Sequence, residues 1–491
     1  MTDLRRALRP AAGQVSVTRV VVLGLVSGLL YVAMYAAQRA IHAGPTSDAF
    51  AAGLALYPII VLGVFALYVC VLGLSRRPLS RDLRLAAFGF PVIFSLFWLL
   101  VAPVFSSDVF AYIAHGYVQV ELGDNPYLVH SSAVAASPLG PELVSYGWRP
   151  VHPATPYGPV LTHLETAIVW FSGADVRLSM LLFKLVAVAS SLGVAAVIWM
   201  ILDRVRPQDR DIGTLAYLWN PAVLVEVAGE GHNDAITTLL ALATVLLVLR
   251  RQVVGGVLTM VVAALTKYVP VLLAPALLGY LWRGAQDKQL VLWRIAGGAV
   301  AGAGVAAALY APYWAGQQTF SGLASSGRAG HTGSTQTVLA EVFSRVVSEQ
   351  TALVAVSVAA TATVVLAAIV IAVRVRTPTD LLRGTAVLMV IYTLLSPAYW
   401  PWYVVMPIAF LALVPRGTFL VLIVAMSLGS RLVAPLNSLY VDDLIGRPTF
   451  FLLTWLGAVG VPLLTVLVYR LGDFGVGLSA RSRRRYGTFD P

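Results

Sequence analysis

Charged residues and cysteine are both scarce in this chain of 491 residues. Asp, Glu, Lys and Arg together make up 12% of the residues, about half of the roughly 25% that is usual in soluble domains. This shortage of charge excludes an ordinary soluble domain. The only cysteine, Cys70, lies inside an apolar run. The chain therefore forms no intrachain disulfide, and we interpret the thiol as a buried packing group.

Long apolar runs take the place of the missing charge. The chain is 58% hydrophobic, with a mean hydropathy of +0.81. The runs are continuous rather than alternating, which favours membrane helices over a barrel. We therefore predict an all-α fold, a polytopic transmembrane bundle of about 14 spans that forms one membrane domain over residues 1–491. Several runs are short, so some spans are open to reinterpretation as half-helices.

Basic residues gather in short loops between the apolar runs, for example at residues 76–84, 204–210 and 374–383. Such loops face the cytoplasm, so the net charge of +11 requires no nucleic acid partner. This orientation predicts a multi-pass protein of the inner (plasma) membrane with both ends inside. Two large loops, residues 106–158 and 315–350, are then extracytoplasmic.

Asp108 stands at the outer end of the run Leu85–Phe105. A carboxylate at the mouth of a span is costly unless it faces water or has a function. One interpretation is a charge that favours the N-terminus of a helix over residues 106–119. The other is a general base whose pKa rises through partial desolvation. The apolar stripe of this segment predicts an amphipathic helix lying at the outer interface.

Further polar residues fall on the same predicted face. In Gly231-His232-Asn233-Asp234, the last two residues are candidate caps of a returning helix, whose N-terminus suits a phosphate, and His232 adds a hydrogen-bond donor. Lys267 is a second phosphate candidate or a snorkelling lysine. One histidine with scattered carboxylates lacks the spacing of a metal site, so we assign no metal ligands.

Aromatic and loop residues complete the candidate site. Tyr157, in a turn before the short run Pro159–Phe171, lies where the outer loop returns to the membrane. That run is too short to span and is interpreted as a half-helix. Trp402 and Tyr403 belong either to an interfacial aromatic belt or to a sugar-binding surface. Arg328 and His331 lie in a Gly/Ser-rich loop that is either a lid or disordered.

The ordered set of motifs resembles a family. From about the third predicted span onward, the chain is similar to the polyprenol-phosphate-mannose-dependent alpha-1,6-mannosyltransferases of actinobacteria, which are integral-membrane glycosyltransferases of the C superfamily. The motifs that carry the resemblance are, in chain order, Ser107-Asp108-Val109-Phe110-Ala111-Tyr112, Asn125-Pro126-Tyr127, Thr155-Pro156-Tyr157-Gly158-Pro159, Gly231-His232-Asn233-Asp234, Lys267-Tyr268 and Pro401-Trp402-Tyr403.

The resemblance implies a C-superfamily fold and a hexosyltransferase. Its donor is a polyprenyl-phosphate sugar, its acceptor is a cell-envelope mannan or lipoglycan on the outer face, and Asp108 matches the catalytic carboxylate. We expect a groove between spans near the half-helix to bind the polyprenyl tail, in contact with membrane lipids. The remaining candidate substrate-binding residues are Tyr112, Asn125, Arg149, Tyr157, His232, Asn233, Asp234, Lys267, Arg328, His331, Trp402 and Tyr403.

Some alternatives stay open at this point. No nucleotide-binding motif is present and no cofactor is assigned, although a divalent cation is not excluded. Related members use pentose donors, so the sugar is open. A flippase for lipid-linked sugars or a membrane polymerase is the rival class. Transporters place ionisable groups near mid-membrane and often contain repeats, whereas here the polar residues gather on one face, which favours the enzyme.

Overall fold

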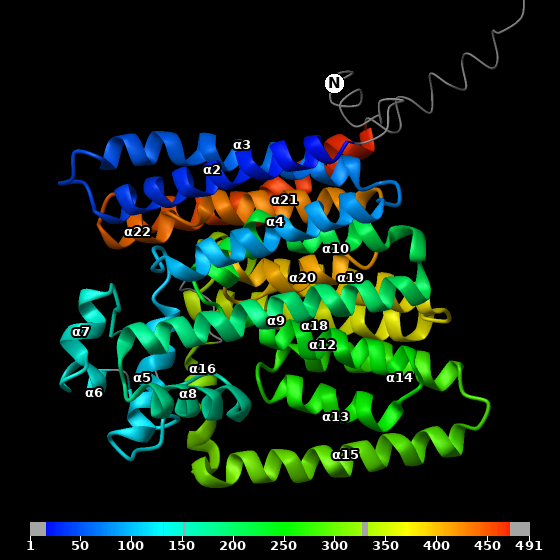
Figure 1. Ribbon diagram of the computed structural model, residues 1–491. Helices are drawn as coiled ribbons and strands as arrows, with labels where there is room; N and C mark the ends of the chain where they lie inside the picture. The colour runs from blue at the N-terminus through cyan, green and yellow to red at the C-terminus, as the bar shows by residue number, and fades with distance from the viewer. Residues whose placement is uncertain (1–15, 131, 151–153, 327–331, 472–491) are drawn as a thin grey trace, which may run out of the picture.

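The computed structural model describes residues 16–130, 132–150, 154–326 and 332–471. Within these ranges every regular element is a helix and no strand occurs (Figure 1). Continuous apolar runs satisfy their backbone hydrogen bonds internally only as helices, since lipid offers no partners. The predicted all-α class is therefore confirmed.

Nine helical segments of the described chain are long and apolar enough to cross a membrane. They comprise α2 (Val17–His42), α3 (Phe50–Leu74), α4 (Arg81–Leu100), α9 (Val176–Val205), Lys288–Tyr313 with α15 (Lys288–Tyr310), α18 (Glu349–Arg374), α19 (Pro378–Leu395), Thr418–Val441 with α21 (Thr418–Val433) and α22 (Leu436–Val441), and Arg447–Leu471 with α23 (Arg447–Trp455). Two α4 residues, Trp98 and Leu99, are buried near the C-terminal end of this helix.

Shorter helices fill the middle of the bundle. A bent pair, Pro207–Leu218 with α10 (Arg210–Leu218) and Pro221–Gly229 with α11 (Pro221–Val223), turns by 43°. Four more apolar helices are α12 (Asp234–Leu249), α13 (Val253–Ala264), Val269–Arg283 with α14 (Ala274–Arg283) and Pro401–Leu411 with α20 (Val405–Leu411). With the bent pair as one span, up to ten segments of the described chain meet the membrane test, so the count of 14 stays a prediction.

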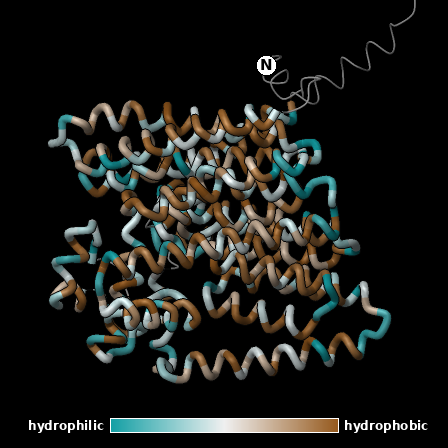
Figure 2. The backbone as a smooth tube through the Cα atoms, viewed as in Figure 1, coloured by the Kyte–Doolittle hydropathy of each residue, from teal (hydrophilic) through white to brown (hydrophobic). Residues whose placement is uncertain are grey.

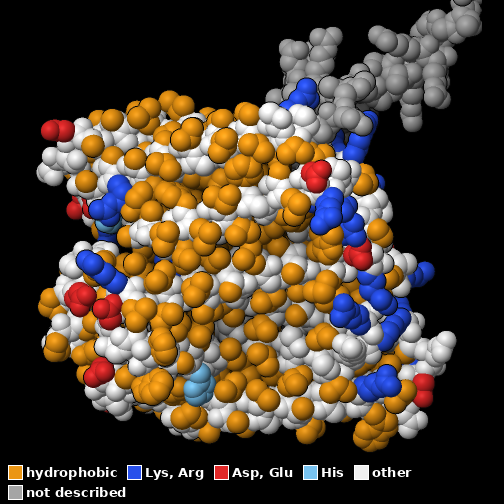
Figure 3. Space-filling view, in the orientation of Figure 1, with side chains coloured by type: hydrophobic (Ala, Val, Ile, Leu, Met, Phe, Trp, Pro, Cys, Tyr) orange, Lys and Arg blue, Asp and Glu red, His pale blue; other side chains and the backbone are white. Residues whose placement is uncertain are grey.

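The two ends of the bundle differ in charge. The helices run side by side, apolar along their lengths and more hydrophilic where they end (Figures 1 and 2). On the face seen in Figure 3, most Lys and Arg side chains gather at the right-hand end, where α4 begins. The opposite end carries α5 (Asp108–Val120), α6 (Ser132–Ala135), α7 (Gly140–Ser145) and α8 (Pro159–Ser172). The positive-inside rule predicts that the basic end is cytoplasmic.

Helix α5 corrects one expectation. It forms where predicted, but it is not an amphipathic helix with one face in water, because all residues from Val109 to Val118 are buried. Helices α6, α7, α8 and α9 supply an apolar cluster around it. In Figure 1, α5 runs across the direction of the bundle helices. Asp108 is therefore the first residue of a buried crossing helix, which places its carboxylate at an internal boundary.

The neighbouring segments pack closely onto α5. Helix α8 has 14 residues, too few to span, as predicted for the half-helix, and it begins with Pro159 at the favourable first position. The N–H groups of Gly158 and Val160 donate to the carbonyl oxygens of Thr266 and Leu265, at 3.1 and 3.0 Å. These bonds connect α8 to the end of α13. Cys70, by contrast, was expected to be buried, and it is exposed on the surface of α3.

The second loop that was predicted to be extracytoplasmic, residues 315–350, also reaches the end of the bundle that carries α5. Its described helices are Gly316–Phe320, α16 (Ser321–Ser326) and α17 (Thr335–Phe343). Just before them, the Tyr313 hydroxyl donates to Gln119 Oε1 of α5 at 2.8 Å and lies 3.2 Å from His163 Nδ1 of α8. The segment that leaves Lys288–Tyr313 is thus attached to the layer that carries Asp108.

Candidate active site

Two buried side chains hold the segment that leads from α4 into α5. The Glu230 carboxylate accepts backbone N–H groups from Val104, Phe105 and Ser106 at 3.0–3.3 Å. On the other side, the Lys184 ammonium donates to the carbonyl of Trp98 at 2.7 Å and to that of Val101. Charge-assisted bonds of this kind are stronger than neutral ones. The backbone before Asp108 is therefore restrained by buried charges from two other helices.

Asp108 faces His232 across this segment. The Asp108 side chain is 15% exposed, that of His232 is fully buried, and Oδ2 lies 3.9 Å from Nε2. Ser106 links them, because its Oγ lies 3.0 Å from His232 Nε2 and accepts the N–H of Asp108 at 3.2 Å. The Ser106 hydroxyl thus satisfies the backbone N–H of Asp108 at the start of the helix, and the Asp108 side chain does not perform this role. The carboxylate remains partly open to solvent.

A buried ion-pair network lies behind His232. Glu226 Oε2 is 3.2 Å from His232 Nδ1, and Arg431 Nη1 is 2.9 Å from the other Glu226 oxygen. Burial disfavours the imidazolium, but the hydrogen-bonded Glu226 carboxylate and further carboxylates outweigh it, so the pKa of His232 is raised above 6.5. The two ring nitrogens of His232 thus face Glu226 on one side and Ser106 and Asp108 on the other.

Aromatic rings cover this imidazole. The Trp402 ring stacks on His232 at 4.0 Å with an angle of 20°, and Trp400 stacks on Trp402 at 5.3 Å. Tyr403 packs edge-on against Trp402. A cation over an indole face is attracted by its quadrupole. The structure thus brings Trp402 into the site as a partner of His232, a role that differs from both an interfacial belt and a sugar-binding surface.

Lys267 and Asp234 form the other side of the site. Lys267 Nζ lies 2.9 Å from Asp234 Oδ2, with side chains 17% and 10% exposed, and 5.5 Å from the ring centre of Tyr157. Tyr157 meets Tyr112 of α5 edge to face at 5.6 Å. Burial, followed by the charge of Asp108, raises the pKa of Tyr157 well above 10. The phenol therefore stays neutral and can donate a hydrogen bond.

Asn233 lies between these two groups, at the N-cap position of α12. Its side chain makes no capping bond. Within the described part of the chain, neither its amide nitrogen nor its oxygen has a hydrogen-bond partner, although both are buried. Buried polar groups are normally paired, so this amide is available to a bound molecule. Asp234, the first residue of α12, bonds Lys267 instead of capping.

Of four further predicted site residues, two contact other parts of the chain and two lie outside the described residues. Asn125 forms a turn, because Oδ1 accepts the Tyr127 N–H at 3.0 Å and Nδ2 donates to the Tyr313 carbonyl at 2.8 Å. Arg149 lies near His42, at the C-terminal end of α2. Arg328 and His331 lie outside the described residues. The contacts therefore support Asp108, Tyr112, Tyr157, His232, Asn233, Asp234, Lys267, Trp402 and Tyr403 as one group.

Several contributors to this group were not among the predicted site residues. They are Ser106, Lys184, Glu226, Glu230 and Arg431. Glu226 and Glu230 carry a weak sequence signal, since they flank the His232 motif in an apolar region. Arg431 carries a similar signal as a lone arginine inside the apolar run 418–433, where buried charges are rare unless they are functional.

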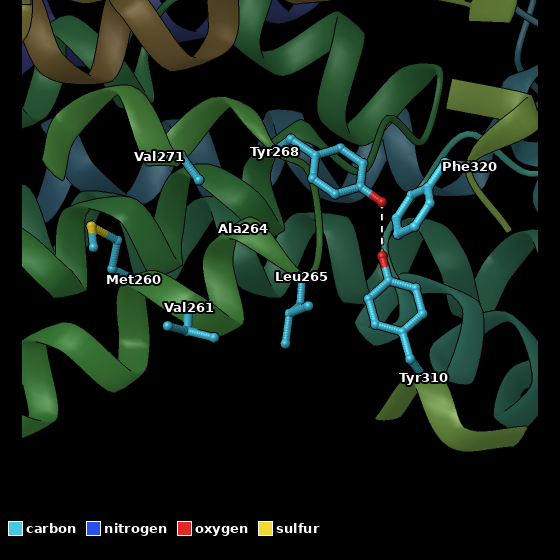
Figure 4. Close-up of a pocket in the computed structure, with 8 residues that line it drawn as sticks. All are labelled: Met260, Val261, Ala264, Leu265, Tyr268, Val271, Tyr310 and Phe320. Atoms are coloured by element: carbon cyan, nitrogen blue, oxygen red, sulfur yellow. Dashed lines mark hydrogen bonds between the residues drawn. The ribbon is translucent and has the colours of Figure 1, made fainter. Parts of the chain in front are cut away.

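An apolar groove is lined by residues that lie just before and just after Lys267 in the sequence. Its volume is about 210 Å³, and its lining includes Leu265, Tyr268 and Phe320. Figure 4 shows the Tyr268 and Tyr310 hydroxyls hydrogen-bonded to each other at one side of it, at 2.8 Å. Leu265 and Tyr268 lie two residues before and one residue after Lys267. The segment that carries Lys267 therefore contributes to the wall of this groove, while the ammonium group pairs with Asp234.

The described residues contain no group of three or more His, Cys, Asp and Glu side chains arranged to hold a metal ion. Asp108 and Asp234 are the partly exposed carboxylates of the site. Asp108 faces His232, and Asp234 is paired with Lys267.

The fold and the site together define a polytopic helical membrane protein whose ionisable groups converge at one end of the bundle. A family model described as alpha-(1->6)-mannopyranosyltransferase, N-terminal domain, matches residues 10–284, more than half of the chain. The protein belongs to this family. The match includes Asp108, His232 and Lys267, whereas Trp402 and Tyr403 lie beyond it.

Two curated relatives carry the name alpha-(1->6)-mannopyranosyltransferase A. The protein from Corynebacterium glutamicum is 30% identical over 200 residues, which are 40% of this chain and 36% of the relative. That from Mycobacterium tuberculosis is 27% identical over 249 residues, 49% of this chain and 46% of the relative. The chain thus matches less than half the length of each relative.

Proposed function

We propose that this protein transfers a mannosyl residue from polyprenyl-phosphate-mannose to a mannan or lipoglycan acceptor on the outer face of the membrane. The linkage formed is alpha-1,6 and the anomeric carbon inverts. The names of the two relatives support the sugar and the linkage. The observation that carries the proposal is the partly exposed Asp108 carboxylate, which faces a buried His232 in the segment that matches the family.

The proposed reaction is a single displacement. The acceptor hydroxyl oxygen attacks the anomeric carbon on the side opposite the phosphate. The bond from that carbon to the phosphate oxygen breaks, and the polyprenyl phosphate leaves with the electron pair. Asp108 takes the acceptor proton as general base. Because the reacting oxygen gains nucleophilicity as the proton leaves, one carboxylate suffices, and no second covalent step on the protein is required.

The leaving phosphate is stabilised by groups opposite Asp108. Lys267 supplies positive charge, and the Asn233 amide and the N-terminal N–H groups of α12 supply donors. In the structure Lys267 is paired with Asp234 at 2.9 Å, so the phosphate shares this lysine with a carboxylate. His232 acts at longer range, because Glu226 and Ser106 already take its two nitrogens.

The tail of the donor leaves along the apolar groove beside Lys267. Its lining contains the side chains of Met260, Val261 and Leu265, together with Tyr268 and Phe320 (Figure 4). Each buried CH₂ group contributes about 0.8 kcal/mol. A phosphate at Lys267 and an isoprenoid chain in the groove are thus neighbouring parts of one amphiphile, which supports a lipid-linked donor.

Membranes that contain the protein, labelled polyprenyl-phosphate-mannose and a short mannoside acceptor test the proposal. The expected result is an elongated mannoside that carries the label, with an alpha-1,6 bond identified by linkage analysis. Membranes without the protein are the control. Label that crosses sealed vesicles without transfer contradicts the proposal and identifies a flippase. Transfer only from a pentose-linked lipid rejects mannose as the donor sugar.

A further inference from the structure

A second cavity lies at the far end of α4 from the site. Its volume is about 730 Å³, and it opens between α4 and α9. Arg81, the first residue of α4, is part of its rim. Helix α4 has 20 residues and so rises about 30 Å, one bilayer core, before it reaches the segment that Glu230 holds. The cavity is therefore distinct from the candidate active site.

Two matching helix faces make the walls. Residues 81, 84, 85, 88 and 89 of α4 and residues 192, 195, 196, 199 and 200 of α9 line the cavity, with Thr214 and Leu218 of α10. Both sets follow the spacing of one helix face. Each extends over eight residue steps, about 12 Å, close to the roughly 15 Å of one leaflet of the hydrocarbon core. The groove thus matches one leaflet in depth.

The chemistry of the groove changes along its length. Its inner part is apolar, and Gly89 leaves open space there, because a Cβ at this position would meet nothing within 4 Å. Its mouth carries Arg81 and Arg84. Arg84 is paired with Asp211 at 2.9 Å, whereas Arg81 is exposed and no ion pair is described for it in the part of the chain that the structure covers. One cation at the mouth is therefore available to an anion.

Several other carboxylates at this end are paired with their own arginines. Asp203 pairs with Arg210, whose guanidinium also lies 4.2 Å from the Trp199 ring centre. Asp209 pairs with Arg206 and Arg416 at 2.6 and 2.5 Å. The nearest acid in sequence is Asp82, in the first turn of α4. Most carboxylates at the basic end thus have their own arginine partners.

We propose that this groove binds an anionic phospholipid of the cytoplasmic leaflet. One acyl chain lies between α4 and α9, and the headgroup phosphate meets Arg81 at the mouth. Basic pockets between membrane helices on the cytoplasmic side bind anionic headgroups by this combination of forces. The bound lipid stabilises α4, the helix that leads to Asp108. Binding of the lipid does not depend on the sugar or the acceptor proposed above.

Native mass spectrometry of the full-length protein in detergent tests the proposal. The protein is offered phosphatidylglycerol and phosphatidylcholine in equal amounts, with different masses. The expected result is several-fold more bound phosphatidylglycerol. Arg81→Gln is expected to bring the two lipids to parity. Gly89→Leu, which fills the open space on a helix face, is expected to lower binding of both. Arg77→Gln is the matched control, since Arg77 is exposed in the preceding loop and does not line the groove.

Three results would overturn the proposal. Equal retention of the two lipids by the unchanged protein shows that any lipid fills the groove. An equal loss of selectivity in Arg77→Gln and Arg81→Gln shows general attraction to a basic surface. Unchanged binding in Gly89→Leu excludes the acyl chain from the groove. Elution profiles and unfolding temperatures of the variants, compared with those of the unchanged protein, identify any loss caused by misfolding.

Discussion

At the scale of single residues, the central question is what Asp108 does. A carboxylate that only favours a helix N-terminus contributes about 0.3–1 kcal/mol. A general base contributes about 10²–10⁴-fold to a rate, several times more in free energy. The Ser106 hydroxyl already accepts the backbone N–H of Asp108. A residue other than Asp108 therefore caps this N–H at the start of the helix. The two roles therefore differ enough in size to be separated by one substitution.

Asp108→Asn is expected to lower transfer about 100-fold or more, while the unfolding temperature changes little. The amide keeps the shape of the side chain but cannot take a proton. Labelled-donor assays on membranes with matched protein amounts give the rate. Asp124→Asn, at an exposed carboxylate of the same loop, is the control and should keep near-normal activity. If Asp108→Asn retains most of the activity, Asp108 is not the base.

His232 gives the protein a pH-dependent term in its stability. Its pKa is higher in the folded protein than the ordinary 6.5. The stabilisation from its charged form is therefore complete below about pH 6.5 and is lost as the pH rises through the raised pKa. Thermal unfolding between pH 6 and 9 should show a falling Tm, and His232→Gln should flatten that part of the curve.

The control for this pH series is His130→Gln, at an exposed histidine that pairs with Ser132. It should keep the slope of the unchanged protein. Glu226→Gln removes the main partner of the imidazole and should flatten the curve as His232→Gln does. If His232→Gln and the unchanged protein have the same slope, the charged imidazole makes no net contribution to folding.

The residues of the site were predictable to different degrees. Asp108, His232 and Lys267 stand out because each is an ionisable group between apolar runs. Arg431 lies 199 positions after His232, and a single sequence contains no information about which distant charges pair. Asn125 was expected to contact substrate, yet its amide completes a turn. Turn-forming and ligand-binding asparagines look alike in sequence, because both follow from the same short polar side chain.

At the scale of elements, the contact between α5 and α8 positions the site. Gly116 of α5 allows it, since a Cβ at this position would lie 2.5 Å from the carbonyl oxygen of Glu165 and 2.5 Å from Val169 Cγ2. This close packing also explains why the prediction of an amphipathic helix at the membrane interface was wrong. The apolar stripe indicates one buried face, but α8 and α9 cover the small and polar faces of α5 as well, and sequence periodicity does not report such neighbours.

Gly116→Ala is expected to destabilise the protein and to lower transfer. Alanine alone would favour a helix by about 0.5–1 kcal/mol, but overpacking costs about 1–3 kcal/mol, and the carbonyl of Glu165 is backbone that cannot rotate away. Thermal unfolding and the transfer assay measure both effects. Gly297→Ala of α15 is the control, because no atom lies within 4 Å of its Cβ. An equal Tm for both variants contradicts this account.

At the scale of the whole molecule, composition predicts more than local pattern does. The shortage of charge and the length of the apolar runs are properties of the entire chain, and they suffice for the all-α membrane bundle. The number of spans is harder to predict, because α12 and α20 are short helices that are largely buried inside the bundle. These helices are surrounded by other helices instead of lipid. The length of an apolar segment therefore no longer decides whether that segment crosses the membrane.

The orientation of the bundle is the last prediction. Basic residues at one end make that end cytoplasmic, and the layer with Asp108 then faces outward. In a Cys70→Ser background, Asp124→Cys should react with a membrane-impermeant maleimide on intact cells, whereas Arg77→Cys should react only after permeabilisation. Both positions are exposed loop residues, so a difference in labelling reports the side of the membrane. The reverse pattern would place Asp108 in the cytoplasm, away from an extracytoplasmic acceptor, and the proposed reaction could not occur there.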